Sequence, residues 1–339
     1  MPRWCSTAMP ATDSCFSTSL TSPTTSTDSW AEAMRAIRQN ELGGPEVLEV
    51  VDIEPPTPAM GQILVRVHAA GVNPVDVMNR ESGVFVGAPP FILGWDVSGV
   101  VESVGPGVTL YRPGDDVFGL LPFPQGHGAY AEYVVGPTRA FVPKPEKLDH
   151  VQAAALPLAG LTAWQALVDT ARIQTGHRVL ITAPAGGVGH LAVQIAKAHG
   201  AHVIGLSTAD NANYVTSIGT DETIDYTTTD FSSALSGLDV VFDLIGHEYP
   251  AKALDVLKPG GILVSTLPQT LPPLIQDATA KSIRPAGLFV EADRLGLVAL
   301  AELVRNGKLT PTIAATFPLE AAGAAQSYRA GVGKVVLTL

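Results

Sequence analysis

The sequence predicts an α/β protein in which a β-rich first domain precedes a doubly wound parallel sheet. From about residue 158, strand-like runs alternate with helix-like runs, the rhythm of repeated β-α units. A glycine cluster, AGGVG at 185–189, separates one such strand from the following helix. Before residue 150 the chain instead shows β-rich segments broken by Gly and Pro turn signals.

The first segment, residues 1–33, differs from everything that follows. It is dominated by Ser and Thr and has no apolar periodicity, so we expect a disordered leader. Its single basic residue, Arg3, and the lack of a continuous apolar run argue against a secretory or mitochondrial address. Met34 opens the first segment with the pattern of a folded strand and turn.

Between residues 35 and 150 we expect a small β-barrel or sandwich. Strands are predicted at 63–72, 95–105 and 129–135, the last because its apolar and polar residues alternate. Helical periodicity is scarce throughout this region.

The later part of the chain predicts six parallel strands with helices between them. The strands are expected at 178–183, 202–207, 222–226, 239–246, 261–266 and 287–290, and helices at 188–199, 251–257 and 293–306. Right-handed crossovers between such strands make a doubly wound sheet, and we expect ligands at the carboxyl ends of its strands. The last stretch, from residue 312, returns to strand, helix and strand, and we expect it to rejoin the first domain.

Composition excludes several classes of function. The chain has 339 residues and a net charge of −11, which disfavours nucleic acid as a partner. No apolar run reaches the roughly 20 residues that cross a bilayer. The two cysteines, Cys5 and Cys15, both precede the folded part, so neither cysteine-bound zinc nor a disulfide framework is expected there. A reducing, cytoplasmic location is the natural inference.

The glycine cluster predicts a dinucleotide site. A helix N-terminus offers free N–H groups and a positive dipole end to a pyrophosphate. A side chain at Gly186 would block that approach, and one at Gly189 would push the helix off the sheet. Pro184 stands at the first glycine position of the usual G-x-G-x-x-G pattern, so a merely tight turn is the alternative. The predicted contacts are Ala185, Gly186, Gly187, Val188 and Gly189.

The end of the second strand bears on which dinucleotide binds. NAD sites usually carry Asp or Glu there, and this chain has Ser207 and Thr208. The hydroxyls of these two residues could bind a 2′-phosphate without charge repulsion. Tyr226 could add another hydroxyl, although an ordinary strand-end tyrosine is the alternative. Against this, 203–225 contains no Lys or Arg, and Asp210 is near. We expect NADP(H), with NADH left open.

With these features in hand, the chain resembles the zinc-independent quinone oxidoreductase-like branch of the medium-chain dehydrogenase/reductase superfamily. This resemblance implies a GroES-like catalytic domain over 34–157 and 299–339, a Rossmann domain over 158–298, a cofactor between them and a homodimer. The matching segments are AAGVNPVD (69–76), LGWDVSGVVESVG (93–105), RPGDDVFG (112–119), GAYAEYV (128–134), AAALPLAGLTAWQAL (153–167), AGGVGHLAVQIAK (185–197) and GKVVL (333–337).

The departures from zinc-dependent relatives point to the chemistry. Asn73 stands where those enzymes hold a zinc-binding Cys, and Gly94-Trp95-Asp96 where they have Gly-His-Glu. The cysteine-rich lobe is missing between Asp116 and Tyr130. We therefore expect no metal, and without a Lewis acid simple alcohols are poor substrates. Quinones, enones and enals remain as expected substrates, because they delocalise the charge that a hydride brings.

The resemblance also implies site residues, each with a plainer alternative. Asn73 would lie beside the nicotinamide ribose or a substrate carbonyl, or be a turn residue before proline. Thr162 would touch the nicotinamide side of the cofactor, or only bond its own helix. Lys334 would reach the cofactor phosphate, or be a solvated lysine.

At the ends of the fourth to sixth strands, family positions supply backbone bonds to the carboxamide or wall the nicotinamide. Gly246 would allow close approach, while Asp243 is as consistent with a structural cap. Leu267, Phe289 and Val290 would serve as such walls, with plain core packing as the alternative for each.

No acid–base pair stands out. We expect His190 to pack or cap its helix, Tyr130 and Trp95 to pack, and His127 to lie in a loop that could border the cleft. The sequence thus predicts an NADPH-dependent reductase of a quinone or α,β-unsaturated carbonyl. An enoyl reductase of a biosynthetic pathway is a close variant, and a non-catalytic NADP(H)-binding sensor is the rival.

Overall fold

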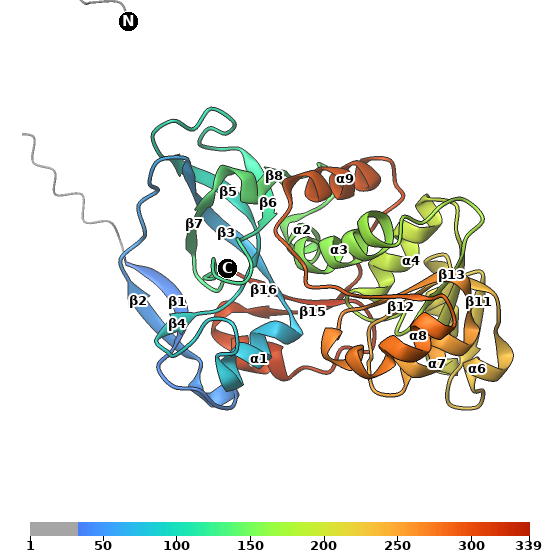
Figure 1. Ribbon diagram of the computed structural model, residues 1–339. Coiled ribbons are helices and arrows are strands. Elements are labelled where there is room, and N and C mark those ends of the chain that lie inside the picture. Colours follow the sequence, from blue (N-terminus) through green and yellow to red (C-terminus); the bar gives the residue numbers. More distant parts are fainter. Residues whose placement is uncertain (1–32) are drawn as a thin grey trace, which may run out of the picture. The chain divides into compact units, whose positions relative to one another are not determined.

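The structure is a computed structural model, and it describes residues 33–339. The predicted leader therefore lies outside the described residues, apart from Ala33. The described chain has the predicted mixed α/β fold, with one lobe built on antiparallel and mixed sheets and another on a parallel sheet (Figure 1). We call them the first and the second lobe.

The first lobe contains two sheets. A three-stranded sheet has the order β2-β1-β4, and a seven-stranded sheet has the order β15-β16-β3-β5-β6-β8, with β7 also paired to β3. The C-terminal strand β16 pairs antiparallel with β3, which confirms that the last stretch rejoins this lobe. The bounds are β1 Met34–Gln39, β2 Glu49–Ile53, β3 Gln62–Val72, β4 Phe91–Ile92, β5 Asp96–Val104, β6 Asp116–Leu120, β7 Tyr133–Pro137, β8 Phe141–Pro143, β15 Ile313–Pro318 and β16 Lys334–Thr338.

The second lobe is built on a six-stranded parallel sheet with the order β11-β10-β9-β12-β13-β14. Counted along the chain this is the order 3-2-1-4-5-6, and the strand order reverses between β9 and β12, where such sheets bind their ligands. The prediction of a doubly wound sheet is confirmed. The bounds are β9 Arg178–Ile181, β10 His202–Ser207, β11 Glu222–Asp225, β12 Leu238–Asp243, β13 Leu257–Ser265 and β14 Arg284–Gly287.

Helices connect these strands and join the two lobes. The α-helices are α1 Pro74–Ser82, α2 His150–Ala154, α3 Pro157–Trp164, α4 Gly189–Ala198, α5 Ala209–Ser217, α6 Phe231–Ala234, α7 Tyr249–Val256, α8 Ile275–Ala280, α9 Arg294–Arg305 and α10 Ala322–Ser327. A π-helical turn, Gln165–Thr170, continues α3, and short 3-10 turns lie at Pro45–Val47, Thr138–Ala140, Pro268–Thr270, Pro272–Leu274 and Leu319–Ala321.

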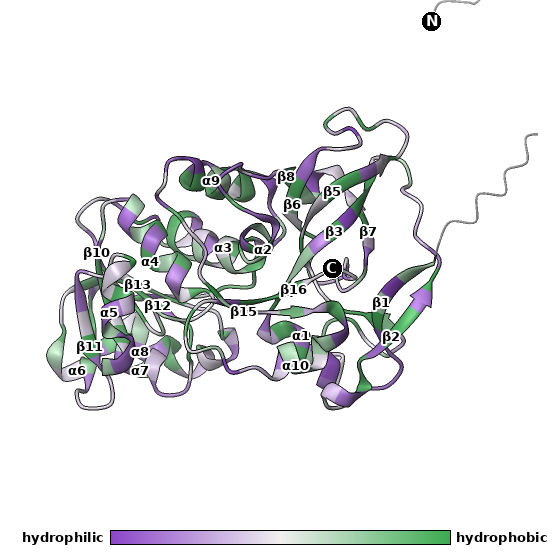
Figure 2. Ribbon diagram, turned by 180° about the vertical axis from the view of Figure 1, so that it is seen from behind, coloured by the Kyte–Doolittle hydropathy of each residue, from purple (hydrophilic) through white to green (hydrophobic). Residues whose placement is uncertain are grey.

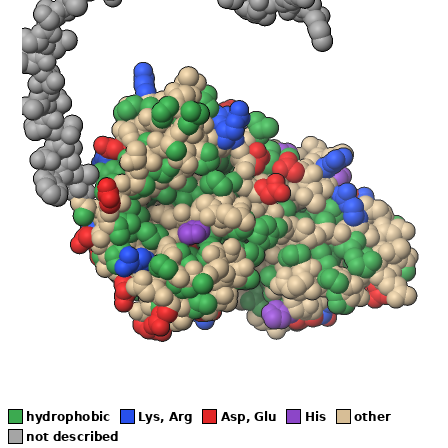
Figure 3. Space-filling view, turned by 60° about the vertical axis from the view of Figure 1, so that its left-hand side comes forward, with side chains coloured by type: hydrophobic (Ala, Val, Ile, Leu, Met, Phe, Trp, Pro, Cys, Tyr) green, Lys and Arg blue, Asp and Glu red, His purple; other side chains and the backbone are tan. Residues whose placement is uncertain are grey.

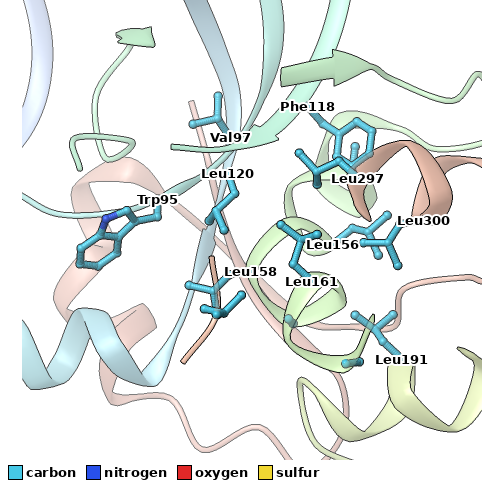
Figure 4. Packing of buried hydrophobic residues seen from close by; sticks show 14 of the residues in the cluster. Trp95, Val97, Phe118, Leu120, Leu156, Leu158, Leu161, Leu191, Leu297 and Leu300 are labelled. Atoms are coloured by element: carbon cyan, nitrogen blue, oxygen red, sulfur yellow. The ribbon is translucent and has the colours of Figure 1, made fainter. Parts of the chain in front are cut away.

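Helix α3 joins the lobes because it is apolar on every side. Residues 157–163 are all buried, and such a helix must be packed on all faces. Leu158 and Leu161 of α3 lie in one cluster with strand residues of the first lobe, with Leu191 of α4 and with Leu300 of α9 (Figure 4). Coloured by hydropathy, α3 and the central strands are mostly apolar, whereas the outer loops are mostly polar (Figure 2).

Several predicted elements are corrected by the structure. The predicted strand 287–290 is displaced, since β14 spans Arg284–Gly287 and the chain leaves the sheet after Leu288 bonds to Ser265. This is an edge strand, where Pro285 and a charged residue are tolerated and hide the apolar pattern. The predicted strand 129–135 begins only at Tyr133, because residues 129–131 make isolated bonds to β1 and to the chain before β5.

Two further corrections concern helices. Helix α1 was not predicted, because its short sequence PVDVMNRES has few apolar residues; Pro74 at its first turn and Asp76 three residues after Asn73 are the signals for its start. The predicted domain boundary at 298/299 falls inside α9, which is one continuous helix. A boundary there must move to one end of Arg294–Arg305.

Candidate active site

The glycine turn, residues 185–189, follows β9 and opens α4, as the sequence predicts. An ideal Cβ on Gly189 would lie 2.0 Å from the carbonyl oxygen of Ala183, so only glycine lets the helix pack there. An ideal Cβ on Gly186 would meet nothing closer than 3.4 Å. The space over Gly186 is therefore open, and its backbone can be approached by a ligand.

His190 holds the glycine turn in place through contacts of its buried ring. It is fully buried; Nδ1 lies 2.9 Å from the Gly186 carbonyl oxygen, and Nε2 accepts the backbone N–H of Thr312 at 3.0 Å. Burial lowers the pKa of His190 to about 4, so the ring is neutral near pH 7. The expectation that this histidine packs or caps its helix is confirmed.

The start of β16 docks on the same turn. The N–H of Gly333 donates to the carbonyl oxygen of Ala185 at 2.9 Å, and the Lys334 stem packs beside Gly187. Lys334 is only 4% exposed, so it is not the solvated lysine that the sequence left open. Its ammonium donates to the Val72 carbonyl oxygen at 3.0 Å and to Asn73 Oδ1, rather than to the turn.

Asn73 lies at the centre of a buried polar network, which we call the Asn73 network: Asn73, Asp76, Asp96, Tyr130 and Lys334. The side-chain amide of Asn73 is held at both ends, since Oδ1 accepts from Lys334 and Nδ2 donates to Asp96 Oδ2 at 2.8 Å. Its backbone N–H donates to Asp76 Oδ2 at 2.7 Å and so starts α1. The residue is 3% exposed.

Asp96 connects this network to α3. Its Oδ1 accepts the N–H of Leu158 at 2.7 Å, and its Oδ2 lies 3.7 Å from the Lys334 ammonium. Burial raises the pKa of Asp96 and lowers that of Lys334, while each of the two charges favours the charged form of the other. One turn further along α3, the hydroxyl of Thr162 donates to the Leu158 carbonyl oxygen at 2.7 Å, which is the plainer of its two predicted roles.

Asp76 and Tyr130 complete the network. The Tyr130 hydroxyl donates to Asp76 Oδ2 at 3.0 Å, and both side chains are fully buried. Burial raises the pKa of Asp76 to about 7, and burial beside Asp76 raises that of Tyr130 well above its usual value. Asp76 Oδ1 is buried without a hydrogen-bond partner among residues 33–339.

Ser207 ends the second parallel strand, as predicted, and Thr208 directly precedes α5. The Ser207 hydroxyl is buried and has no partner in the described chain, so it is available to a ligand. Asp225 pairs with Ser207 in the sheet register, and a hydrogen bond from Thr227 lowers its pKa. Tyr226 follows directly and is 45% exposed.

The ends of β12 and β13 form a hydrogen-bonded rim. Asp243 accepts from the Thr182 hydroxyl, from the Ser265 hydroxyl and from the N–H of Gly246, so its side chain is a structural cap. Gly246 has a positive φ of 76°, and an ideal Cβ there would lie 2.6 Å from a methyl carbon of Leu267. The two residues named as cofactor contacts, Gly246 and Leu267, are therefore neighbours.

Phe289 and Val290 lie beyond β14 rather than within it. The Phe289 ring is half exposed and packs against rings of the first lobe, with centroids 5.2 Å from Phe85 and 5.1 Å from Phe123. Val290 is buried in the main core. This aromatic contact brings together the segment that follows α1, the segment that follows β6 and the segment that follows β14.

Two other predicted residues have structural roles. His127 Nδ1 lies 2.7 Å from the Ile92 carbonyl oxygen, and the ring packs against Phe91 and Trp95. Trp95 is fully buried, and its indole N–H donates to the Pro124 carbonyl oxygen at 3.2 Å. The expectation that Trp95 packs is confirmed.

The remaining features of residues 33–339 bear on ligands only weakly. No three His, Cys, Asp or Glu side chains of this part are grouped so as to hold a metal ion. None of its helices combines the length and apolarity that a membrane crossing needs. One face shows acidic and basic side chains scattered among apolar ones (Figure 3). A surface pocket of about 640 Å³ lies between α4, α5 and residues 307–312, and none of the predicted site residues lines it.

The class of protein follows from fold and site together. A parallel sheet of order 3-2-1-4-5-6 with a glycine turn at its reversal point is joined to a lobe that supplies buried polar side chains beside that turn. Two family models match these parts: residues 59–146 match an alcohol dehydrogenase GroES-like domain, and residues 218–337 match a family described as zinc-binding dehydrogenase.

Individual relatives narrow this class. The chain is 35% identical over 325 residues to a 2-haloacrylate reductase of a Burkholderia species, covering 88% of this chain and 97% of that protein. It is 34% identical over 328 residues to the quinone oxidoreductase of Rattus norvegicus, covering 90% and 98%. A solved quinone oxidoreductase from Coxiella burnetii superposes with a TM-score of 0.84 at 37% identity, covering 91% and 100%. The chain therefore belongs to the quinone oxidoreductase-like branch of the medium-chain dehydrogenase/reductase superfamily and is an oxidoreductase.

The sequence analysis assigned no site role to three members of the Asn73 network. Tyr130 was expected only to pack, Asp76 lies in a family motif without a functional pattern of its own, and Asp96 was considered only as the residue that replaces Glu of the zinc-dependent relatives. Asp76 could have been found as the helix-start partner of Asn73. Nothing in the sequence shows that residues 57 positions apart in the chain, such as Tyr130 and Asn73, both contact Asp76.

Proposed function

We propose that this protein transfers a hydride from NADPH to a quinone or to the β-carbon of an α,β-unsaturated carbonyl, without a metal. The observation that carries the proposal is the open backbone at Gly186 beside the buried Asn73 network. Both parts come together where β16 begins, because Gly333 bonds to the glycine turn and Lys334, the first residue of β16, belongs to the Asn73 network. The quinone oxidoreductases among the relatives support the choice of acceptor.

The residues present fit a nicotinamide dinucleotide. Residues 186–189 would hold the pyrophosphate through backbone N–H groups, because the space that a Cβ on Gly186 would fill is free. The unpartnered hydroxyl of Ser207 would bond the adenosine ribose or its phosphate. When bound, the reduced nicotinamide supplies the hydride, and the chain supplies position and electrostatics.

The donor set supports a metal-free reaction. Asn73 replaces a zinc-binding Cys of the zinc-dependent relatives, and its amide oxygen is already committed to Lys334. Both oxygens of Asp96 accept hydrogen bonds from the chain. An amide held in this way is a weak metal ligand, whereas a carbonyl acceptor needs only hydrogen-bond donors.

Steady-state assays with purified protein test this function. We expect NADPH-dependent reduction of 1,4-benzoquinones and cyclic enones, unchanged after exhaustive chelation, and little oxidation of simple alcohols. Zinc bound in stoichiometric amount together with alcohol oxidation would contradict the proposal. Tight NADPH binding without turnover of any acceptor would favour the non-catalytic sensor instead.

The preference for NADPH over NADH rests on Ser207 and Thr208, which replace the carboxylate typical of NAD sites. Asp225 disfavours NADPH, because its negative charge lies beside Ser207 in the sheet. In S207D the added charge should reduce kcat/KM for NADPH at least tenfold and leave that for NADH within about threefold. A wild-type protein that uses NADH better would make NADH the cofactor and Asp225 the residue to test.

Assembly as a homodimer is a further part of the proposal. The parallel sheet ends at β14, whose outer edge has no partner strand in the described chain, and an unpaired edge can pair with a second copy. Light scattering at micromolar concentration should give twice the monomer mass, and a monomer mass would contradict this.

The alternative function, an enoyl reductase of a biosynthetic pathway, would be indicated by a preference for thioester enones over quinones.

A further inference from the structure

The peptide that joins Gly186 to Gly187 has no side chain on either side to restrict its orientation. Glycine explores more backbone conformations than any other residue, so this peptide rotates more easily than its neighbours. In a trans peptide the carbonyl oxygen and the N–H group point in opposite directions. An anion can therefore use the N–H of Gly187 only while the carbonyl of Gly186 is kept pointing away from it.

In the structure the Gly186 carbonyl points toward helix α4. Its oxygen accepts the backbone N–H of His190 at 3.0 Å, and Nδ1 of the His190 ring lies 2.9 Å from the same oxygen. The N–H groups of Gly187 and Val188 have no acceptor among residues 33–339. The turn thus keeps two uncommitted N–H donors next to the open space at Gly186.

The His190 ring holds this carbonyl in only one protonation state. The backbone N–H of Thr312 lies 3.0 Å from Nε2 and can only donate, so Nε2 must carry a lone pair. The Gly186 oxygen can only accept, so Nδ1 must carry the hydrogen. The other neutral tautomer is mismatched at both contacts, and a doubly protonated ring would set an N–H against the N–H of Thr312.

Thr312 is a firm anchor for the ring. Its carbonyl oxygen accepts the N–H of Lys334 at 2.9 Å, and its hydroxyl oxygen accepts from Tyr214 at 2.9 Å. His190 itself has no exposed surface, so water does not compete for either ring nitrogen. The ring therefore ties the mobile peptide of the turn to a fixed segment 122 positions further along the chain.

We infer that His190, as the neutral tautomer with its hydrogen on Nδ1, is a positioning residue for dinucleotide binding. It fixes the peptide between Gly186 and Gly187 so that the N–H groups of Gly187 and Val188 stay available to the pyrophosphate. The inference rests on the proposed function and adds a side chain that acts only through the backbone. Without this hold, the ligand has to order the turn itself, and part of its binding free energy is lost.

Two substitutions separate the two contacts of the ring. H190N keeps an N–H donor at the position of Nδ1 and has nothing at that of Nε2. H190Q instead brings an amide oxygen to the position of Nε2 and leaves the Gly186 carbonyl without its side-chain donor. As matched controls, H199N and H199Q change a ring at the other end of α4, whose Nδ1 lies 2.8 Å from the Ile195 carbonyl oxygen.

Titration calorimetry with NADPH and, separately, with NADH measures Kd. For the dinucleotide that wild type binds, we expect H190Q to raise Kd about tenfold, the effect of weakening one hydrogen bond to a charged group, and H190N to stay within about threefold. Both variants lose one buried hydrogen bond, so both should lower the melting temperature. The two His199 variants should keep the wild-type Kd.

Kinetics add a readout that a merely structural role does not give. With 1,4-benzoquinone as the acceptor, H190Q should raise KM for the dinucleotide about tenfold and keep kcat within about threefold, because the turn contributes to binding and not to hydride transfer. A purely structural role would make Kd and KM follow the loss of melting temperature in both variants.

A third readout uses the wild-type protein without a ligand. With nitrogen-15-labelled histidine, NMR distinguishes a ring nitrogen that carries a hydrogen from one that does not, and triple-resonance spectra connect the ring to the His190 backbone. We expect a hydrogen on Nδ1 and none on Nε2 at pH 7, where the ring is neutral because burial lowers its pKa to about 4. A hydrogen on Nε2 at this pH would overturn the inference.

The remaining outcomes also decide. If H190N and H190Q raise Kd equally, the ring acts through fold stability alone and the inference is wrong. If H190Q keeps the wild-type Kd, the peptide needs no side-chain hold and the inference is again wrong. Equal Kd values in variants of a protein that binds a dinucleotide refute only the inference, whereas a wild-type protein that binds neither NADPH nor NADH refutes the proposed function itself.

Discussion

The two sides of the candidate site are built in opposite ways. The glycine turn is one contiguous stretch, 185–189, whose proposed ligand-binding groups are backbone N–H groups. The Asn73 network joins four separate parts of the chain, residues 73–76, 96, 130 and 334, and works through side chains. The glycine turn therefore depends on its backbone conformation, whereas the Asn73 network depends on the charges and dipoles of its side chains.

This difference sets how each side responds to its surroundings. Backbone groups do not titrate, and His190 behind the turn stays neutral down to about pH 4. The Asn73 network holds two buried carboxyl groups and a buried ammonium, and the pKa of Asp76 is raised to about 7. We therefore expect the glycine turn to be sensitive to steric change and the Asn73 network to pH.

The largest effect should come from crowding the turn. In G189V the side chain must displace Ala183, whose carbonyl oxygen lies 2.0 Å from the ideal Cβ position. Because that atom belongs to the backbone, relaxation is expensive, and we expect a loss of more than about 4 kcal/mol in the free energy of unfolding. Urea unfolding measures it. A variant with nearly wild-type stability would show that the turn is not rigid.

The next prediction concerns the pH dependence of stability. Asp76 has a folded pKa of about 7 against 3.8 for the free group, so between these values the folded chain holds a proton that the unfolded chain has lost. Its contribution is complete below about pH 4 and falls by about 1.4 kcal/mol per unit as the pH rises to about 7.

The variant D76N removes this proton uptake. Relative to wild type, D76N should gain free energy of unfolding from pH 4 to pH 7, by as much as about 4 kcal/mol, because its amide does not titrate. Urea unfolding at pH 4, 5.5 and 7 measures the difference, with D255N as the exposed control. Parallel curves for wild type and D76N would contradict the raised pKa.

A gentler change at the turn separates binding from folding. In G186A the methyl group meets nothing closer than 3.4 Å, so the fold and the melting temperature should be unchanged. The same methyl occupies the space that a pyrophosphate needs, and we expect Kd for the dinucleotide to rise 10- to 100-fold, about 1.4 to 2.7 kcal/mol. Titration calorimetry measures it, and an unchanged Kd would remove residues 186–189 from the phosphate site.

The smallest effect is expected between the two sides, at Thr162. Its hydroxyl is committed to the Leu158 carbonyl oxygen, so T162V should reduce the free energy of unfolding by about 1 kcal/mol. The dinucleotide Kd should stay within threefold. A tenfold rise would show that the hydroxyl leaves Leu158 for the cofactor, as the family resemblance implies.

Patterns that are local in the chain were predicted well. The β-α rhythm and the glycine turn with the strand and helix around it depend on residues within about ten positions, and the structure has them where the sequence indicates. Elements without a strong apolar pattern were missed or displaced. Helix α1 begins through Asn73 and Asp76 rather than through an apolar face, and β14 is an edge strand that carries a proline.

The sequence by itself determined the fold class, the place of the glycine turn and the residue types available to the chemistry. Only the tertiary structure decided that Lys334 is buried against Asn73, 261 positions away, and that Asp96 holds the other end of the same amide. Burial and pairing depend on which strands become neighbours, here β16 beside β3. The orientation of a dipole and the pKa of a carboxyl follow from those neighbours, and no local pattern in the chain encodes them.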